Sequence, residues 1–125
     1  MAEDTEPSTM LTPAMFALLL ALHAGERHGY ALMADVARLS GDTIRLGPGT
    51  LYRTLQRLRV DGLVEELEAS ELPALRGDRR AERRRSYRVT AKGHDAAAAE
   101  ARRLALLVDA ASAFGLLTNR KRYGG

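Results

Sequence analysis

Residues 47–63 read GPGTLYRTLQRLRVDGL, and this stretch decides the fold. Its leucines recur at steps of four and three residues, which is the spacing of one apolar helix face. These positions are Leu51, Leu55 and Leu58. Proline suits a first helical turn, and an Asp-Gly pair favours a helix end. We therefore expect a helix that begins at Pro48 or Thr50 and ends at Asp61.

The side of this helix that faces away from the leucines is rich in arginine. Arginine binds guanine, and glutamine binds adenine, through paired hydrogen bonds, while a helix N-terminus favours phosphate. Tyr52 would pack its ring and offer its hydroxyl to a phosphate. An ordinary solvated helix face has the same composition, so the pattern alone leaves both interpretations open. The candidate nucleic-acid contacts on this helix are Gly49, Thr50, Tyr52, Arg53, Gln56 and Arg57.

Two further helices are expected before this stretch. Residues 13–24 follow a threonine cap, open with proline and are apolar on nearly every face, which predicts a central, buried helix. A second helix begins near residues 28–30 and ends at residues 40–42, and the hydroxyl of Tyr30 at its start is a candidate phosphate contact. In the short connector that follows it we expect a β-bridge through Ile44.

Two strands are expected after the arginine-rich helix, at residues 63–68 and 84–90. In the second strand Tyr87 and Val89 alternate with polar residues, which is the period of a half-buried strand. The two strands would pair as an antiparallel hairpin around the loop formed by residues 69–83.

This hairpin carries a run of arginines. Arg84 and Arg88 would face the glutamates of the first strand across the sheet, and Arg85 is a candidate for this role or for a phosphate contact. The loop arginines have few acidic neighbours, so they would add salt-dependent affinity for a nucleic-acid backbone rather than sequence selectivity. The candidate backbone contacts of the hairpin are Arg76, Arg79, Arg80, Arg83 and Arg85.

The last helix is expected from Ala91 to about Leu117, with Thr90 as its N-cap. Small and branched residues recur along it at steps of four and three, which is a short heptad seam. Small residues let two helices approach closely, so we expect a homodimer interface here, and packing of the helix on its own domain is the alternative. The seam consists of Ala97, Ala101, Leu104, Val108 and Ala111.

Three helices, a hairpin and a long helix, in this order, indicate a winged helix-turn-helix domain with an added dimerisation helix. The fold class is then mainly α with a small β-hairpin. In such a domain the third helix enters the DNA major groove, and the hairpin, or wing, lies along the backbone. The expected segments are a disordered tail at 1–10, the winged domain at 11–90 with its wing at about 63–90, the dimerisation helix at 91–118 and a basic tail at 119–125.

Three stretches resemble the PadR family of transcriptional regulators, in its type with a short C-terminal region. GPGTLYRTLQRLRVDGLVEE (47–66) is similar to the third helix of that family and its exit, RRSYRVTAKG (84–93) to its second wing strand and the following helix cap, and HGYALM (28–33) to the start of its second helix. The resemblance covers about residues 11–117 and implies a homodimeric DNA-binding regulator, usually a repressor. Many members release DNA on binding a small molecule, and here the apolar cleft between the first and last helices of the dimer would be the site of such an effector.

The composition excludes several other classes of protein. The chain has 125 residues, which suits one domain, and a net charge of +3 with 17 Arg against 2 Lys. The absence of cysteine excludes disulfides, thiol nucleophiles and Cys-ligated zinc. The histidines, His23, His28 and His94, lack metal-ligand spacing, and no catalytic triad or phosphate-binding glycine loop is present, so we expect neither an enzyme nor a metal or other cofactor.

No signal peptide is visible, and the most apolar run is too short to span a membrane, so we expect a soluble cytoplasmic protein. Two functions from different classes then remain. The first is a dimeric repressor that binds a roughly palindromic operator in double-stranded DNA. The second is a winged-helix interaction module that binds an acidic protein or an RNA. Sequence-specific binding to a duplex in the presence of excess competitor DNA distinguishes them.

Overall fold

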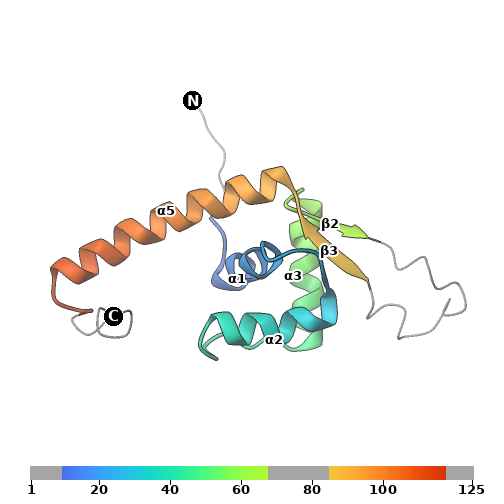
Figure 1. The fold of residues 1–125 in the computed structure, drawn as a ribbon, viewed down its shortest axis with the longest axis horizontal. Coiled ribbons are helices and arrows are strands. Elements are labelled where there is room, and N and C mark those ends of the chain that lie inside the picture. The colour runs from blue at the N-terminus through green and yellow to red at the C-terminus, as the bar shows by residue number, and fades with distance from the viewer. Residues whose placement is uncertain (1–9, 68–84, 118–125) are drawn as a thin grey trace, which may run out of the picture.

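The computed structural model describes residues 10–67 and 85–117, which Figure 1 draws in colour. Over these residues the chain forms four helices and three short strands. In chain order the elements are α1 (Pro13–Leu22), β1 (Arg27–His28), α2 (Gly29–Leu39), α3 (Pro48–Val60), β2 (Val64–Leu67), β3 (Ser86–Val89) and α5 (Ala91–Ala113). The architecture is that of a winged helix, which confirms the expected fold class.

Helix α1 lies in the middle of the domain, between α5 on one side and α2 and α3 on the other (Figure 1). Thr12 caps it, because its hydroxyl accepts a hydrogen bond of 3.1 Å from the amide of Met15. Leu18, Leu19 and Leu22 are at most 1% exposed. The sequence therefore predicted the central place of α1 correctly, although the helix ends at Leu22 rather than Ala24.

The leucine face of α3 is the second half of the core. Leu51, Leu55 and Leu58 are at most 1% exposed. At the end of the helix Gly62 adopts a φ of +81°, which lets the chain reverse and the amide of Leu63 bond to the carbonyl of Leu58 at 2.9 Å. This turn leads directly into β2, so the Asp-Gly-Leu sequence fixes where the hairpin leaves α3.

The sheet is antiparallel with the strand order β1-β3-β2. The expected hairpin is present, with Glu65 opposite Arg88 and Glu66 opposite Tyr87. The additional strand β1 pairs with the other edge of β3, and it was not predicted. The β-bridge expected through Ile44 is wrong, because the amide of Ile44 bonds instead to the Ser40 hydroxyl at the end of α2.

Helix α5 begins at Thr90, as expected from the sequence. The Thr90 hydroxyl accepts a hydrogen bond from the amide of Gly93 at 3.0 Å and donates one to the carbonyl of Gly62 at 2.7 Å. The helix ends at Ala113 rather than near Leu117, because Gly115 turns the chain with a φ of +82°. Its C-terminal half extends past α1, away from the other helices (Figure 1).

Several expected features lie outside the described residues. They are the first nine residues of the N-terminal tail, the loop arginines Arg76, Arg79, Arg80 and Arg83, the strand residue Arg84, and the basic tail from 119 to 125. Within the described ranges, none of the helices has the length and apolar character that crossing a membrane requires.

Candidate nucleic-acid interface

The N-terminus of α3 is open to solvent. Its N-cap is Gly47, which offers no side chain to the first turn, and the residues from Gly47 to Thr50 are exposed. The guanidinium of Arg53 lies back over this turn, with Nη2 at 3.4 Å from the hydroxyl of Thr50. An arginine charge, the partial positive charge of the helix end and exposed backbone amides therefore converge at one place, which is an arrangement that binds phosphate.

The next turn of α3 carries the other two candidate base contacts, Gln56 and Arg57, and both are exposed. The Nε of Arg57 lies 3.2 Å from a carboxylate oxygen of Asp61, and the Nε of Arg59 lies 3.3 Å from the amide oxygen of Gln56. These contacts lie on the surface and contribute little to stability. The contact with Asp61 holds the Arg57 side chain toward the C-terminal end of α3 and partly neutralises its positive charge. Of the two candidate arginines on this face, Arg53 is therefore the better placed to bind an anion.

The prediction for Tyr52 is wrong in this structure. Its hydroxyl oxygen is buried, with less than 1 Å² accessible, so it does not reach the surface where a phosphate would lie. The ring turns inward because Gly29 of α2 leaves room for it: a Cβ at that glycine would lie 3.0 Å from Cε1 of Tyr52. Tyr30, by contrast, is 52% exposed at the start of α2, as a backbone contact requires.

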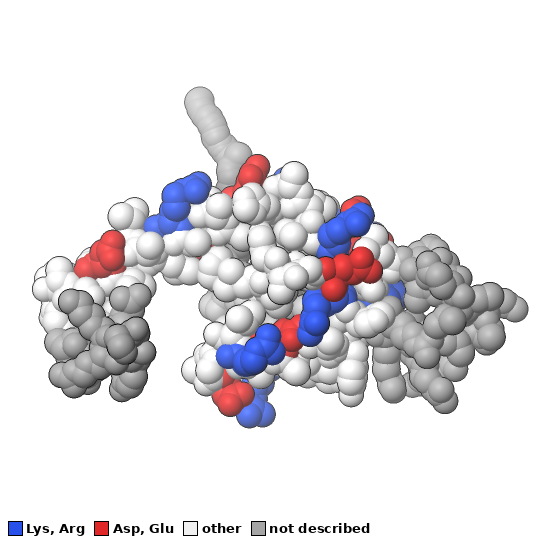
Figure 2. All heavy atoms as spheres, viewed as in Figure 1, with Lys and Arg blue, Asp and Glu red and all other residues white. Residues whose placement is uncertain are grey.

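In the described part of the wing, arginines alternate with glutamates across the strands. Arg85 lies 2.7 Å from a carboxylate oxygen of Glu66, and Arg88 lies 2.6 Å from one of Glu65. The hydrogen bonds that Arg88 donates to Glu65 raise the pKa of its guanidinium. The structure thus favours the cross-strand role for Arg85 over the phosphate role. Figure 2 shows the same mixture of charges, with basic and acidic side chains interspersed over α2 and the sheet.

The seam of α5 divides into two parts. Ala97 is 5% exposed and belongs to the core of its own domain, so its expected place in a dimer interface is wrong. Farther along, Leu104, Val108 and Ala111 are half-buried, Ala101 is exposed, and the neighbouring Leu107 is 56% exposed. One face of α5 therefore packs on the domain at its N-terminal end and continues beyond it as an uncovered apolar surface.

Other apolar side chains near the end of α5, outside the predicted seam, are also exposed. Leu106 is 71% exposed and Phe114 is 82% exposed. Exposed leucines and phenylalanines gathered on one projecting helix are typical of a protein–protein contact.

Two side-chain pairs that involve α5 were not predicted. Glu100 is 7% exposed and accepts hydrogen bonds from Arg103 at 3.1 and 2.6 Å, which lower the pKa of its carboxyl group. At the start of the helix, Nδ1 of His94 lies 3.1 Å from Nε2 of His23, whose other ring nitrogen bonds to the carbonyl of Leu19. The Glu100–Arg103 pair is an i,i+3 contact within one helix, a spacing from which the sequence could have predicted it. The histidine contact depends on how α5 crosses α1, and spacing along the chain carries no signal of it.

Comparison with known proteins places this geometry in a family. Residues 18–99 match the model of the transcriptional regulator PadR-like family. A segment of 55 residues is 47% identical to an uncharacterized 37.1 kDa protein in a transposon of Streptomyces fradiae, and it spans 44% of this chain and 15% of that protein.

Solved structures of regulators share the fold. A transcriptional regulator from Clostridium thermocellum is 20% identical, with a TM-score of 0.63 over 80% of this chain and 87% of its own. RosR of H. salinarum is 26% identical, with a TM-score of 0.55 over 91% of this chain and 87% of its own. A PadR family transcription regulator from Clostridium difficile is 21% identical, with a TM-score of 0.59 over 79% of this chain and 96% of its own. This chain belongs to the PadR-like family of transcriptional regulators.

Proposed function

We propose that this regulator binds double-stranded DNA in a sequence-specific manner and acts in the cytoplasm as a dimeric repressor. The observation that carries the proposal is the exposed first turn of α3, where Arg53 lies over an uncapped helix N-terminus. The leucine face of the same helix is fully buried, so the arginine face is held outward by the core. A helix in this position enters the major groove in helix-turn-helix proteins.

The residues of the interface divide into two roles. Arg53, Gln56 and Arg57 would contact base edges and so select the sequence. Thr50, the backbone of Gly49 and the hydroxyl of Tyr30 would contact phosphates and set the orientation of the domain. Arginines of the wing loop would add affinity that falls as salt rises.

A dimer follows from the uncovered apolar face of α5. Leu104, Leu107, Val108 and Ala111 would pack against the partner subunit, and Leu106 and Phe114 would border this contact. Two-fold symmetry then predicts a roughly palindromic operator. A small-molecule effector, if it acts on this protein, would bind in the apolar cleft between α1 and α5 of the dimer and change the separation of the two α3 helices.

Selection of bound sequences from a pool of random duplexes tests the proposal. The selected duplex is then labelled, and its binding is followed by fluorescence anisotropy at low and moderate salt with excess scrambled duplex. We expect an enriched inverted repeat, retention of binding in the presence of the competitor, and loss of discrimination in the Arg53→Ala variant. If no sequence is enriched and the competitor abolishes binding at both salt concentrations, DNA recognition is ruled out and an acidic protein or RNA becomes the expected partner.

A further inference from the structure

Gly29 marks a junction at which α2, α3 and the wing meet. A Cβ at this position would lie 3.0 Å from a ring carbon of Tyr52 on α3 and 3.1 Å from one of Tyr87 on β3. The amide of Gly29 donates a hydrogen bond of 2.9 Å to the carbonyl of Arg85, the residue before β3. The start of α2 is therefore in contact with both elements that are proposed to touch DNA.

The residues just before Gly29 extend this junction into the sheet. They form β1, in which Arg27 lies opposite Tyr87 and His28 opposite Ser86. A strand of two residues at a sheet edge has too few ladder hydrogen bonds to be held by pairing alone. A further contact is needed to keep β1, and β3 beside it, in a defined position relative to the helices.

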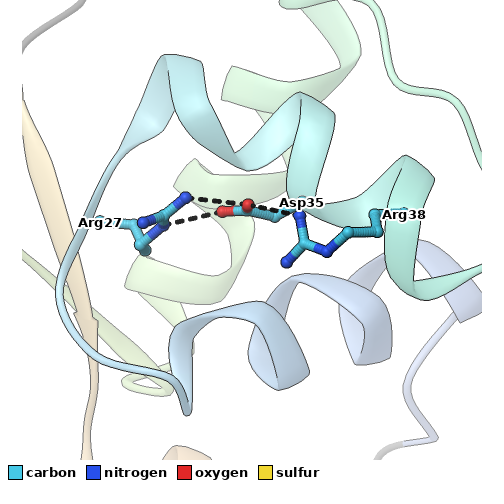
Figure 3. Close-up of polar contacts among 3 residues, drawn as sticks. All are labelled: Arg27, Asp35 and Arg38. Atoms are coloured by element: carbon cyan, nitrogen blue, oxygen red, sulfur yellow. Dashed lines mark hydrogen bonds and ion pairs between the residues drawn. The ribbon is translucent and has the colours of Figure 1, made fainter.

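That contact is made by Asp35, as Figure 3 shows. The carboxylate of Asp35 on α2 accepts two hydrogen bonds from Arg27, at 2.8 Å from Nε and 2.9 Å from Nη2. Asp35 is 4% exposed, and a carboxylate buried to this extent is retained only where a charged partner neutralises it. The second arginine, Arg38, approaches at 3.3 Å and is 69% exposed, so Arg27 is the principal partner.

We propose that Asp35 is a positioning residue for DNA binding. Through Arg27 it fixes β1, and through β1 it holds the wing strand β3 at one orientation relative to α3. The wing and α3 then meet a duplex as one preorganised surface, which lowers the conformational entropy that is lost on binding. This inference rests on the proposed function for its effect on DNA, whereas the coupling of β1 to α2 does not depend on DNA.

Amide hydrogen exchange on the full-length protein tests the coupling in the absence of DNA. In Asp35→Asn the carboxylate charge is lost, and we expect the amides of Gly29 and of the β1–β3 ladder to exchange at least about tenfold faster. The amide of Thr90, which bonds to the carbonyl of Leu63 on the other side of the sheet, serves as the internal reference and should keep its rate. Arg38→Ala, which removes only the longer contact, is the matched control and should leave all these rates unchanged.

A purely structural role for Asp35 predicts a different pattern. It would accelerate exchange at Thr90 and Gly29 equally, through global unfolding, and that result would overturn the proposal. Unchanged exchange at Gly29 would overturn it as well. If Asp35→Asn does not fold, Arg27→Lys provides a milder test. It keeps a positive charge beside the carboxylate but cannot donate the paired hydrogen bonds from Nε and Nη2. We expect it to accelerate exchange at the same amides by a smaller factor.

The DNA measurement uses the duplex selected with the wild-type protein. We expect Asp35→Asn to weaken binding of that duplex and of scrambled duplex by a similar factor, about tenfold. The wing loses its position in this variant, whereas the proposed reading face of α3, formed by Arg53, Gln56 and Arg57, is unchanged. Local exchange that rises with no change in affinity would refute the positioning role. If the wild-type protein bound no duplex at all, the proposed function would fail, and the exchange data would still establish whether Asp35 couples β1 to α2.

Discussion

Gly93 of α5 lies directly against the backbone carbonyl of Leu63. A Cβ at this position would overlap that oxygen and come within 2.8 Å of a methyl group of Val89. The helix therefore crosses the start of the wing at a distance that only glycine allows. The carbonyl of Leu63 also accepts a hydrogen bond from the amide of Thr90, at 3.0 Å, so it cannot move away without breaking this bond. Glycine at this position fixes the angle between α5 and the winged domain.

Gly93→Ala is accordingly expected to lower the free energy of unfolding by about 1–3 kcal/mol, the usual cost of forcing an extra carbon into a packed site. Urea denaturation followed by circular dichroism measures this change. Gly47→Ala is the matched control, because the φ of Gly47 is −79° and no atom lies within 4 Å of an added Cβ. Equal stability losses in the two variants would mean that the close crossing does not constrain α5.

The sequence predicts those parts of the fold whose signal is local. The leucine period of α3, the Thr12 and Thr90 caps and the Gly62 turn each depend on a few neighbouring residues, and the structure confirms all of them. The family also agrees with the expectation from sequence, since its members are transcriptional regulators and not enzymes.

The errors of the sequence analysis arise from contacts between distant segments. Strand β1 has only two residues and forms because β3 has a free edge. The inward turn of Tyr52 depends on space left by Gly29, and the burial of Ala97 depends on where α5 meets the core. Neither the hydrophobic period of a helix or strand nor a helix-capping residue indicates any of these three contacts, so they could not be predicted from local sequence.

Stability at high pH is expected to depend on Tyr87. Burial, helped by the negative charge of Glu66, raises the pKa of its hydroxyl from 10.0 to about 12. The unfolded chain therefore releases this proton at a lower pH than the folded protein does. The contribution of Tyr87 is complete below pH 10 and is lost as the pH rises from 10 to about 12. The loss amounts to about 1.4 kcal/mol per pH unit within this window.

Urea denaturation across that window measures the effect as the difference between the wild type and Tyr87→Phe. The variant lacks the ionising hydroxyl, so its stability should fall less steeply with rising pH. Tyr30→Phe, at an exposed position, is the control and should follow the wild type. Parallel curves for the wild type and Tyr87→Phe would contradict the burial of this hydroxyl.

The proposed dimer interface is tested at Leu107. This side chain lies on the apolar face of α5 and is 56% exposed in the single chain. Leu107→Glu would place a charge in the interface of both subunits, and we expect the dissociation constant of the dimer to rise at least ~100-fold. Sedimentation equilibrium over a range of protein concentrations gives this constant. Ala99→Glu adds the same charge at an exposed position two turns earlier, away from the face that carries Leu104 and Val108, and should leave the dimer intact. A dimer disrupted equally by both variants would place the interface elsewhere on α5.

The ion pair between Arg57 and Asp61 limits the charge that α3 presents to DNA. Their side chains lie 3.2 Å apart, on adjacent turns of the helix. Asp61→Asn would release Arg57 and remove a negative charge from the edge of the proposed reading face. We expect affinity for any duplex to rise several-fold at low salt, and the slope of log affinity against log salt to become steeper by about one. Anisotropy titrations at several salt concentrations give both quantities.

Asp109→Asn makes the same change in net charge on α5, away from α3. It therefore distinguishes the release of Arg57 from the effect of net charge on DNA affinity. It should leave the salt dependence of duplex binding unchanged, because Asp109 is not paired with any residue of the reading face in the described part of the chain. If both variants raised affinity equally, net charge alone would explain the result. If only Asp61→Asn does so, Arg57 lies within reach of a phosphate, and the C-terminal half of α3 takes part in binding together with Arg53.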